Sequence, residues 1–398
     1  MDSTNRDAAA PAPHPDAAAK TSSAPRLTAP DNVRGLIMAI MAIDHASAFI
    51  AHRHSGEWWR GGWTRYTSAV LFLTRFVTHL CAPGFFFLMG LGMYLFASSR
   101  RAQGWSPPRI IQYFVKRGAL LILLNVLVEI WLWKLGTAFQ HHAGEHHERG
   151  LRDIVFPIML TVLSGLGMSM IAGALLLQTG RLVGPISLAL LLICNALIPS
   201  PEQAAASYPV WAQLLLLPGG NQTLWVLYPL LPWLGVCGLG IALGRLLAAG
   251  GDTAARTWRA LPFVGLLAIG LALLDRYGGG FGNIRAARDS SWIEFLNFIK
   301  YPPALTFVLF MLGVNTILLS LLQRPLPVLR VFGQAPLCFY FAHLLLYGGI
   351  GALFFQEPSS LLGMYAVWLV GLVPLYFICQ RYRRFKESKS ADSLWRLF

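Results

Sequence analysis

Charged residues are scarce in this sequence, and acidic residues are the scarcest. Only 13% of the 398 residues are charged, with 18 Asp or Glu against 32 Lys or Arg, whereas 55% are hydrophobic. Soluble domains carry about 25% charged residues. The composition therefore excludes an ordinary water-soluble enzyme and favours a protein that lies in a membrane.

Cysteines and familiar catalytic motifs are also few or missing. The five cysteines all lie in apolar stretches, and their spacing fits neither a zinc site nor a disulfide framework. The sequence has no phosphate loop, Rossmann glycine pattern, Gly-x-Ser-x-Gly motif or zincin motif. The histidine-rich stretch 141–148 lacks companion ligands at a recognisable spacing, so we interpret it as a solvated outer loop. We expect no metal cofactor.

Apolar stretches long enough to cross a bilayer recur along the whole chain. They predict an all-α, polytopic integral membrane helix bundle with about ten transmembrane helices. The predicted spans are 35–52, 69–97, 110–134, 154–177, 182–198, 224–246, 260–275, 303–322, 332–355 and 361–380.

Basic residues cluster at alternate ends of these spans, which argues against a nucleic-acid partner for the excess positive charge. With the N-terminal tail inside, all the clusters face the cytoplasm, as the positive-inside rule requires. We therefore expect both termini to be cytoplasmic and membrane lipids to be neighbours of the protein. The clusters are Arg100–Arg101, Arg109–Arg117, Arg181, Arg245–Arg259, Arg324–Arg330 and Arg381–Lys389.

The predicted organisation is a single membrane domain with two polar ends. Residues 1–30 are rich in Ala, Pro, Ser and Asp, which predicts a disordered cytoplasmic tail. Residues 31–382 form the transmembrane domain, and residues 383–398 form a basic cytoplasmic segment. No internal repeat is evident. The oligomeric state is open, with a homodimer as one alternative.

Arg34 and the pair Asp44–His45 lie within the first span. The eleven steps from Arg34 to His45 make almost whole helical turns, so both side chains lie on one face, about 16 Å apart along the axis. A charged group inside a span is expensive and indicates function. A cation for phosphates and a buried base are what acyl transfer from a coenzyme A thioester requires. Alternatively, Asp44 orients a different group, or the pair satisfies neighbouring helices.

A second polar cluster, Arg75 and His79, lies one helical turn apart in the next span. Pro83 is expected to free a carbonyl and kink this helix. Because both histidines lie in the outer halves of their spans, we expect His45 and His79 to share one polar cavity. The alternative is that His79 bonds to a neighbouring helix.

The first outer loop carries His54, Glu57, Trp58 and Trp59. Tryptophans near a bilayer edge often form an interfacial belt, but they also provide flat platforms that suit sugars. We assign Glu57, Trp58 and Trp59 to acceptor binding, with His54 as an alternative base.

Two later stretches add candidates for the donor site. Lys300 and Tyr301 open one span with a cation and an aromatic ring, and Tyr340 and His343 lie one turn apart in another. For His343, a structural role is as plausible as a functional one. We group Lys300, Tyr301 and His343 with Arg34 and Arg75 as donor-binding candidates.

These residues resemble a bacterial membrane family related to heparan-alpha-glucosaminide N-acetyltransferase. The resemblance runs from Asp31 to the C-terminal basic segment. It rests on Asp31–Gly35, Asp44–His45, Thr78–Gly90, Tyr228–Gly235, Lys300–Pro303 and Phe332–His343. The spacing from Arg34 to His45 is also similar to that of the acyltransferase type 3 membrane enzymes.

The resemblance implies an acyltransferase of the bacterial inner (cytoplasmic) membrane that takes an acyl group, expected to be acetyl, from cytosolic acetyl-CoA. The implied acceptor is an extracytoplasmic, glucosaminide-like carbohydrate, acylated on nitrogen or oxygen. By analogy with acyltransferase type 3, Arg34 holds the donor and His45 is the base. In the lysosomal relative an asparagine replaces Asp44 and the catalytic histidine lies in the following outer loop, nearest to His54. His45 and His54 therefore both remain candidates.

A proton-coupled secondary transporter is the alternative function. Buried Asp44, His45 and His79 could serve as its proton relay. Transporters usually break helices at a mid-membrane site in matched repeats, and this sequence shows no such repeat. The acyltransferase is therefore the leading hypothesis.

Overall fold

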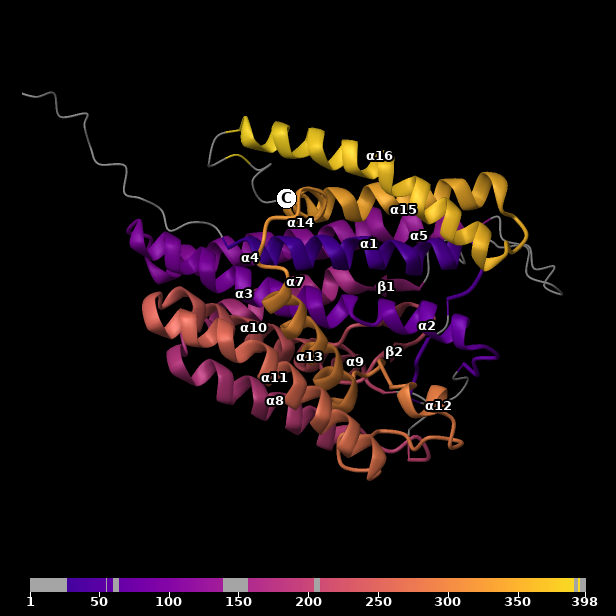
Figure 1. The fold of residues 1–398 in the computed structure, drawn as a ribbon, viewed down its shortest axis with the longest axis horizontal. Helices are drawn as coiled ribbons and strands as arrows, with labels where there is room; N and C mark the ends of the chain where they lie inside the picture. Colours follow the sequence, from indigo (N-terminus) through magenta and orange to yellow (C-terminus); the bar gives the residue numbers. More distant parts are fainter. Residues whose placement is uncertain are drawn as a thin grey trace, which may run out of the picture.

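The computed structural model describes residues 27–54, 56–59, 64–138, 157–203, 208–389 and 393. Nearly all of the regular structure is helical (Figure 1). The first half contains α1 (Thr28–Ile50), α2 (Ala69–Thr78), α3 (Cys81–Ala102), α4 (Pro107–Leu124), the π-helix η1 (Asn125–Glu129), α5 (Ile130–Thr137), β1 (Ile158–Leu160), α7 (Val162–Leu176), the 3₁₀-helix η2 (Gly180–Leu182) and α8 (Val183–Leu197). The second half contains α9 (Val210–Leu215), β2 (Gly219–Gly220), β3 (Leu224–Val226), α10 (Leu230–Ala248), α11 (Gly251–Tyr277), α12 (Trp292–Leu296), α13 (Leu305–Leu321), α14 (Pro327–Gln334), α15 (Pro336–Phe354) and α16 (Leu361–Glu387).

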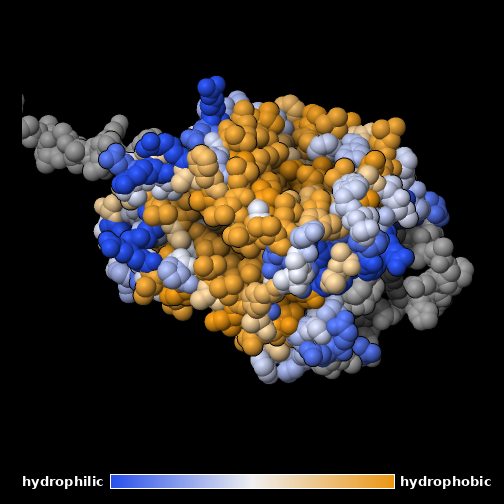
Figure 2. All heavy atoms as spheres, turned by 60° about the horizontal axis from the view of Figure 1, so that its bottom comes forward, coloured by the Kyte–Doolittle hydropathy of each residue, from blue (hydrophilic) through white to orange (hydrophobic). Residues whose placement is uncertain are grey.

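The helices confirm the predicted all-α membrane bundle. Within the described residues, eight helical segments are long and apolar enough to cross a membrane, and α7 and α13 are shorter apolar helices. Figure 2 shows a broad apolar band between two more polar ends on the face toward α8 and α11. Large apolar side chains such as Phe263 and Leu274 of α11 are mostly exposed on the surface. Such a surface suits lipid rather than water.

The predicted span 69–97 is not one continuous helix. It breaks at residues 79–80 into α2 and α3. Pro83 lies in the first turn of α3, where its missing N–H costs nothing, and its ring cannot pack against the carbonyl of residue 79 in a continuous helix. The proline thus explains why the helix breaks at residues 79–80. The break leaves Arg75 and His79 facing the loop that follows α1.

Three other predicted spans also contain breaks. Residues 158–160 form β1, so the helix of the span predicted at 154–177 is α7, which begins only at Val162. Residues 224–226 form β3, so the span predicted at 224–246 begins as a helix only at Leu230. β3 pairs parallel with β1 and antiparallel with β2 in a small three-stranded sheet. The span predicted at 332–355 changes direction at Ala335, between α14 and α15, where the backbone leaves helical geometry.

α1 is the central helix of the bundle and packs against α2, α3, α13, α14, α15 and α16 (Figure 1). Glycines permit the closest of these contacts. A Cβ on Gly35 would lie 1.9 Å from the Leu329 carbonyl oxygen, and a Cβ on Gly333 would lie 1.9 Å from the backbone carbonyl oxygen of Asp31. The polar residues of α1 are therefore surrounded by protein on most sides.

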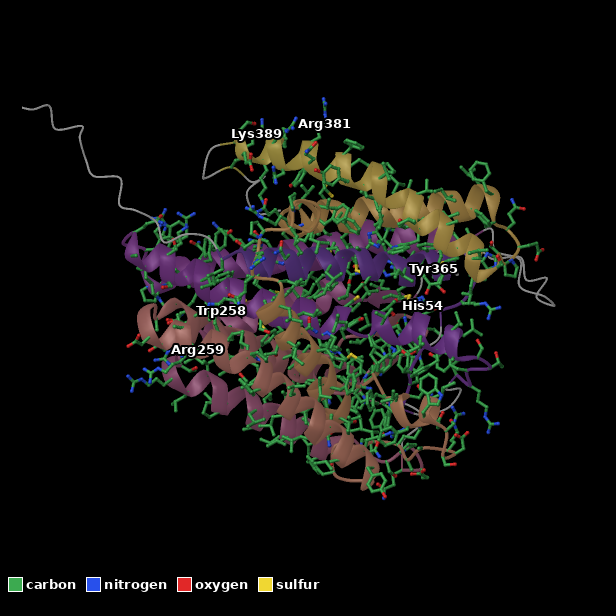
Figure 3. All side chains as sticks on the ribbon, viewed as in Figure 1. His54, Trp258, Arg259, Tyr365, Arg381 and Lys389 are labelled. Atoms are coloured by element: carbon green, nitrogen blue, oxygen red, sulfur yellow. The ribbon has the colours of Figure 1, made fainter. Side chains whose placement is uncertain are left out.

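The two ends of the bundle differ in the residues they carry. Figure 3 shows Arg259 and Lys389 at one end, while His54 and Tyr365 lie toward the other. This arrangement agrees with the predicted clustering of cations on a single side. Which end faces the cytoplasm stays a prediction.

We expect a cysteine at Thr67 to be labelled in intact bacteria by a membrane-impermeant thiol reagent, because Thr67 is exposed at the His54 end. A cysteine at exposed Ala255, at the Arg259 end, should be labelled only after lysis. The unmodified protein is the background control, because its five cysteines are free and four of them are buried. The opposite labelling pattern would reverse the orientation.

Candidate functional site

Asp44 and His45 lie in the C-terminal half of α1 and contact different partners. Consecutive side chains on an α-helix point about 100° apart. Asp44 accepts a hydrogen bond from Nη1 of Arg75 on α2. His45 lies beside His343 of α15 and Trp133 of α5. One dipeptide therefore belongs to two polar clusters.

A buried ion cluster holds the outer loop against α2. Arg75 donates from Nε and Nη2 to the two carboxylate oxygens of Glu57, each at 2.9 Å. This bidentate pairing, together with the Asp44 bond, occupies the guanidinium on two sides. Nε2 of His79 lies 3.2 Å from Oε2 of Glu57. Arg75, predicted to bind the donor, is thus engaged by two carboxylates.

Glu57 lies in the loop after α1 and is buried. Burial alone would raise the pKa of its carboxyl group, but the positive charge of Arg75 and the neighbouring His79 outweigh burial and hold that pKa well below its usual range. Backbone N–H groups of Lys300 and Tyr301 donate to the Glu57 carbonyl at 3.1 Å. The loop is therefore fixed both by charge and by its backbone.

A polar pocket of about 350 Å³ opens beside this cluster at the His54 end of the bundle. Asp44, Arg75 and His54 contribute to its wall. Nδ1 of His54 lies 3.6 Å from Oδ1 of Asp44, and the His54 side chain is 40% exposed against 13% for Asp44. A carboxylate beside an imidazole that reaches solvent is an arrangement suited to acid–base chemistry. The remaining lining residues are Ser47, Arg53, Thr64, Arg65, Tyr66, Thr67, Leu71, Thr74 and Leu361.

His45, next to Asp44 in the sequence, is buried but does not line this pocket. Its ring centroid lies 4.9 Å from that of Trp133, and the His54 centroid lies 5.6 Å from the same indole. The Trp133 ring therefore contacts both candidate bases, His45 and His54. His79 packs instead against Glu57 and Phe307. His45 and His79 therefore have different neighbours, and not the shared cavity that we predicted.

Arg34 lies at the opposite end of α1. Its Nη1 donates to Oδ1 of Asp31 at 3.3 Å and to the carbonyl of Gly333 at 3.1 Å. Helix geometry separates it from His45 by about 16 Å. Arg34 does not join the histidine cluster, and it is near α14 on the side predicted to be cytoplasmic.

The other predicted binding residues lie between the loop and α13. Lys300 is buried, with Nζ 5.0 Å from the centre of the Tyr301 ring. The Tyr301 and Tyr228 hydroxyls are 3.1 Å apart. Trp58 is half-buried against Tyr301, whereas Trp59 is fully buried inside the protein. A buried Trp59 cannot offer the open platform that we predicted for it.

Trp133 and Glu129 also lie in these clusters, although neither was predicted from the sequence. Glu129 is fully buried in the π-helix η1, and its Oε1 accepts a hydrogen bond from the Tyr340 hydroxyl at 2.6 Å. The signal was available, because Glu129 is the only acidic residue in the apolar stretch 110–134. Intramembrane ionisable residues and π-bulges both mark functional sites.

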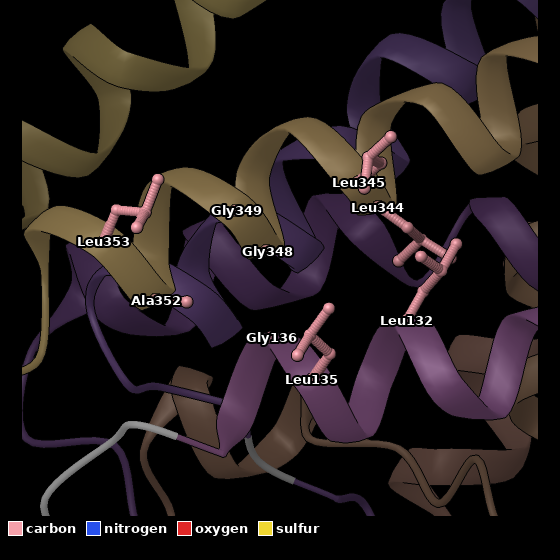
Figure 4. A pocket seen from close by; sticks show the side chains of 9 residues that line it. All are labelled: Leu132, Leu135, Gly136, Leu344, Leu345, Gly348, Gly349, Ala352 and Leu353. Atoms are coloured by element: carbon pink, nitrogen blue, oxygen red, sulfur yellow. The ribbon is translucent and has the colours of Figure 1, made fainter.

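A second, apolar groove of about 200 Å³ runs between α5 and α15 (Figure 4). Leucines and the backbone of Gly136, Gly348 and Gly349 line it. It offers no group for catalysis. The described residues contain no cluster of three His, Cys, Asp or Glu side chains that could hold a metal ion, and the stretch 141–148 lies outside those residues.

An all-α membrane bundle with a carboxylate–imidazole pair in a pocket is suited to a membrane-embedded enzyme. The sequence model of the family described as "Heparan-alpha-glucosaminide N-acetyltransferase, catalytic" matches residues 26–277, more than half of the chain. The chain belongs to this family, as the resemblance predicted. It is thus an integral membrane protein of an acetyltransferase family. No curated protein matches it significantly.

Glu57→Gln should destabilise the protein by about 3–5 kcal/mol, because Arg75 then loses a charged partner in a buried site. The pKa of Glu57 is lowered in the folded state, so its stabilising effect is complete above its unfolded pKa, about 4.3, and is lost as the pH falls through the lower folded value. The wild-type and variant melting temperatures should therefore converge in acid.

Thermal unfolding of the detergent-purified protein between pH 7 and pH 3 measures both effects. Glu357→Gln is the matched control, because Glu357 is exposed at the same end of the bundle. Equal melting temperatures for wild type and Glu57→Gln at pH 7 would contradict a stabilising role for this ion cluster.

Proposed function

We propose that this protein transfers an acetyl group from cytosolic acetyl-CoA to a carbohydrate acceptor on the outer side of a bacterial inner membrane. The acceptor is glucosaminide-like and is acylated on its amine or a hydroxyl. The observation that carries the proposal is the outer pocket with Asp44 and His54 in its wall. Family membership supports the acetyltransferase over the proton-coupled transporter.

The pocket supports an acid–base role for His54. In acetyl transfer, the acceptor loses a proton as it attacks the thioester carbonyl, and the CoA thiolate leaves and takes up a proton. A positioned imidazole accepts the first proton and can return it to the thiolate. Asp44 would orient the His54 ring. His45 is the alternative base, one ring away across Trp133.

The polar lining supports a hydrophilic acceptor. Arg53, Arg65 and Tyr66 lie around the pocket, together with several hydroxyl side chains. Hydroxyls and guanidinium groups are the partners that sugar hydroxyls require. Trp58 is the remaining candidate for a stacking contact, since it is only half-buried.

The inner end of α1 supports the donor assignment. Arg34 lies there beside the carbonyl of Gly333, and Arg383 of α16 bonds to Gln334 in the next position. Guanidinium groups suit the phosphates of coenzyme A. Arg75 is less suited to that task, because two carboxylates already occupy it.

We expect purified wild-type protein in detergent to acetylate glucosamine from acetyl-CoA without any ion gradient. His54→Ala should lower kcat by roughly 100-fold or more, the usual contribution of a positioned base. His52→Ala is the control, because His52 bonds to the Phe355 carbonyl and does not line the pocket. Release of CoA thiol and the mass of the acetylated sugar are the two readouts.

The outcomes separate the alternatives. If His45→Ala abolishes transfer while His54→Ala keeps most of it, His45 is the base. If wild-type protein neither transfers acetyl to glucosamine nor releases CoA thiol, the proposed reaction is wrong.

Arg34→Ala is expected to weaken acetyl-CoA binding about 10- to 100-fold, the worth of hydrogen bonds to a charged group. The kcat at saturating donor should change little. Arg259→Ala is the matched control, because Arg259 is an exposed cation at the same end (Figure 3). Unchanged affinity for acetyl-CoA in a calorimetric titration would remove Arg34 from the donor site.

A further inference from the structure

His45 and His343 form a direct contact between two buried imidazoles. Nδ1 of His45 lies 2.5 Å from Nε2 of His343. The ring centroids are 4.8 Å apart and the ring planes differ by only 14°. Two rings stacked face to face could not bring ring atoms this close, so the rings meet edge to edge, as a hydrogen bond between them requires.

The Phe339 carbonyl decides which way this hydrogen bond runs. Nδ1 of His343 lies 2.9 Å from the Phe339 carbonyl oxygen, which can only accept. Nδ1 of His343 therefore carries the hydrogen, and in the neutral ring its Nε2 is an acceptor. It follows that Nδ1 of His45 donates to His343, and that Nε2 of neutral His45 bears a lone pair.

The lone pair on His45 is available for a ligand. Among the described residues, Nε2 of His45 makes no hydrogen bond. The ring stands edge-on to Trp133, whose other neighbour is His54. The charged or titratable groups that act on His45 are His343, Asp44, His54 and Lys300, with Glu129 beyond Tyr340.

An amine acceptor creates a need for a second proton acceptor. An alkyl ammonium ion loses one proton before its nitrogen can attack the thioester, and a second proton when the amide forms. One of these protons ends on the CoA thiolate as the thiol, and the other is released to water. A single histidine cannot hold both at once.

We propose that His45 and His343 form this second proton acceptor, in addition to His54 with Asp44. Nε2 of His45 takes one proton from the acceptor nitrogen, and the Nδ1 proton of His45 can pass to Nε2 of His343. The positive charge is then shared by two rings and anchored at the Phe339 carbonyl. His343 is a positioning residue that fixes the tautomer of His45, as second-sphere partners of histidine do elsewhere. The proposal rests on the proposed acetyl transfer.

The test compares His343→Leu with His343→Gln in the purified full-length protein. A glutamine side-chain oxygen can still accept from Nδ1 of His45, whereas leucine cannot. With glucosamine at pH 7, His343→Leu should lower kcat about 10- to 100-fold, and KM for acetyl-CoA should not change. His343→Gln should retain most of the activity.

Two further readouts separate proton transfer from a packing defect. The loss in His343→Leu should shrink as the pH rises past the pKa of the glucosamine ammonium, and it should be smaller with an aromatic amine that is already neutral. Tyr347→Phe is the control, because it removes another buried hydrogen bond of α15, to the Trp368 carbonyl, one turn away. Its kcat should stay near the wild-type value.

A loss that is equal at every pH and for both amines would overturn the proposal, as would equal activity of the leucine and glutamine variants. If His343→Leu does not fold, His343→Asn replaces it, because its shorter amide does not reach His45. Wild-type protein that acetylates neither amine would overturn the proposed function itself. Active wild type with unaffected His343 variants would overturn only the dyad.

Discussion

The contact of Arg75 with Asp44 and Glu57 is the constraint on which the His54 end of the molecule depends. These charges are withdrawn from water, so each is tolerable only while its partners stay in place. Meeting that condition fixes three separate segments against one another: the end of α1, the loop that follows it and helix α2. The position of Asp44 in the pocket wall, and with it the approach of His54, is a consequence of this pairing.

The same loop ties the two parts of the chain together. Backbone hydrogen bonds join Glu57 and Trp59 to Lys300 and Tyr301. Nearby on α1, the His45 side chain contacts His343. Residues 26–277 match the family, yet Lys300 and His343 come from the part beyond them. The clusters around α1 therefore draw side chains from both ends of the sequence, and the bundle acts as one unit at this point.

Apolar length and the placement of cations were enough to predict the spans, because both reflect the bilayer and not the details of packing. Local breaks were harder to predict: Pro83 indicated a kink in the second span, but hydropathy hides the strand at 224–226. Within the site, helix periodicity placed Arg34 and His45 at opposite ends of α1. It could not show that Asp44 and His45 contact different partners, or that His45 contacts His343, which lies 298 positions further along the chain. Those contacts depend on how α2, α5 and α15 pack around α1.

The separation along α1 bears on how two substrates from opposite sides can meet. A donor whose phosphates lie near Arg34 must extend its acetyl end about 16 Å along the helix to reach the histidines. In the proposed reaction, the acceptor meets the donor from the pocket at the His54 end, where Asp44 and His54 lie in the wall. The proposed reaction at the histidines thus requires a long, slender donor and a short path for the polar acceptor. The bulky charged part of the donor then never has to cross the apolar band, which removes the largest electrostatic barrier to transfer across a membrane.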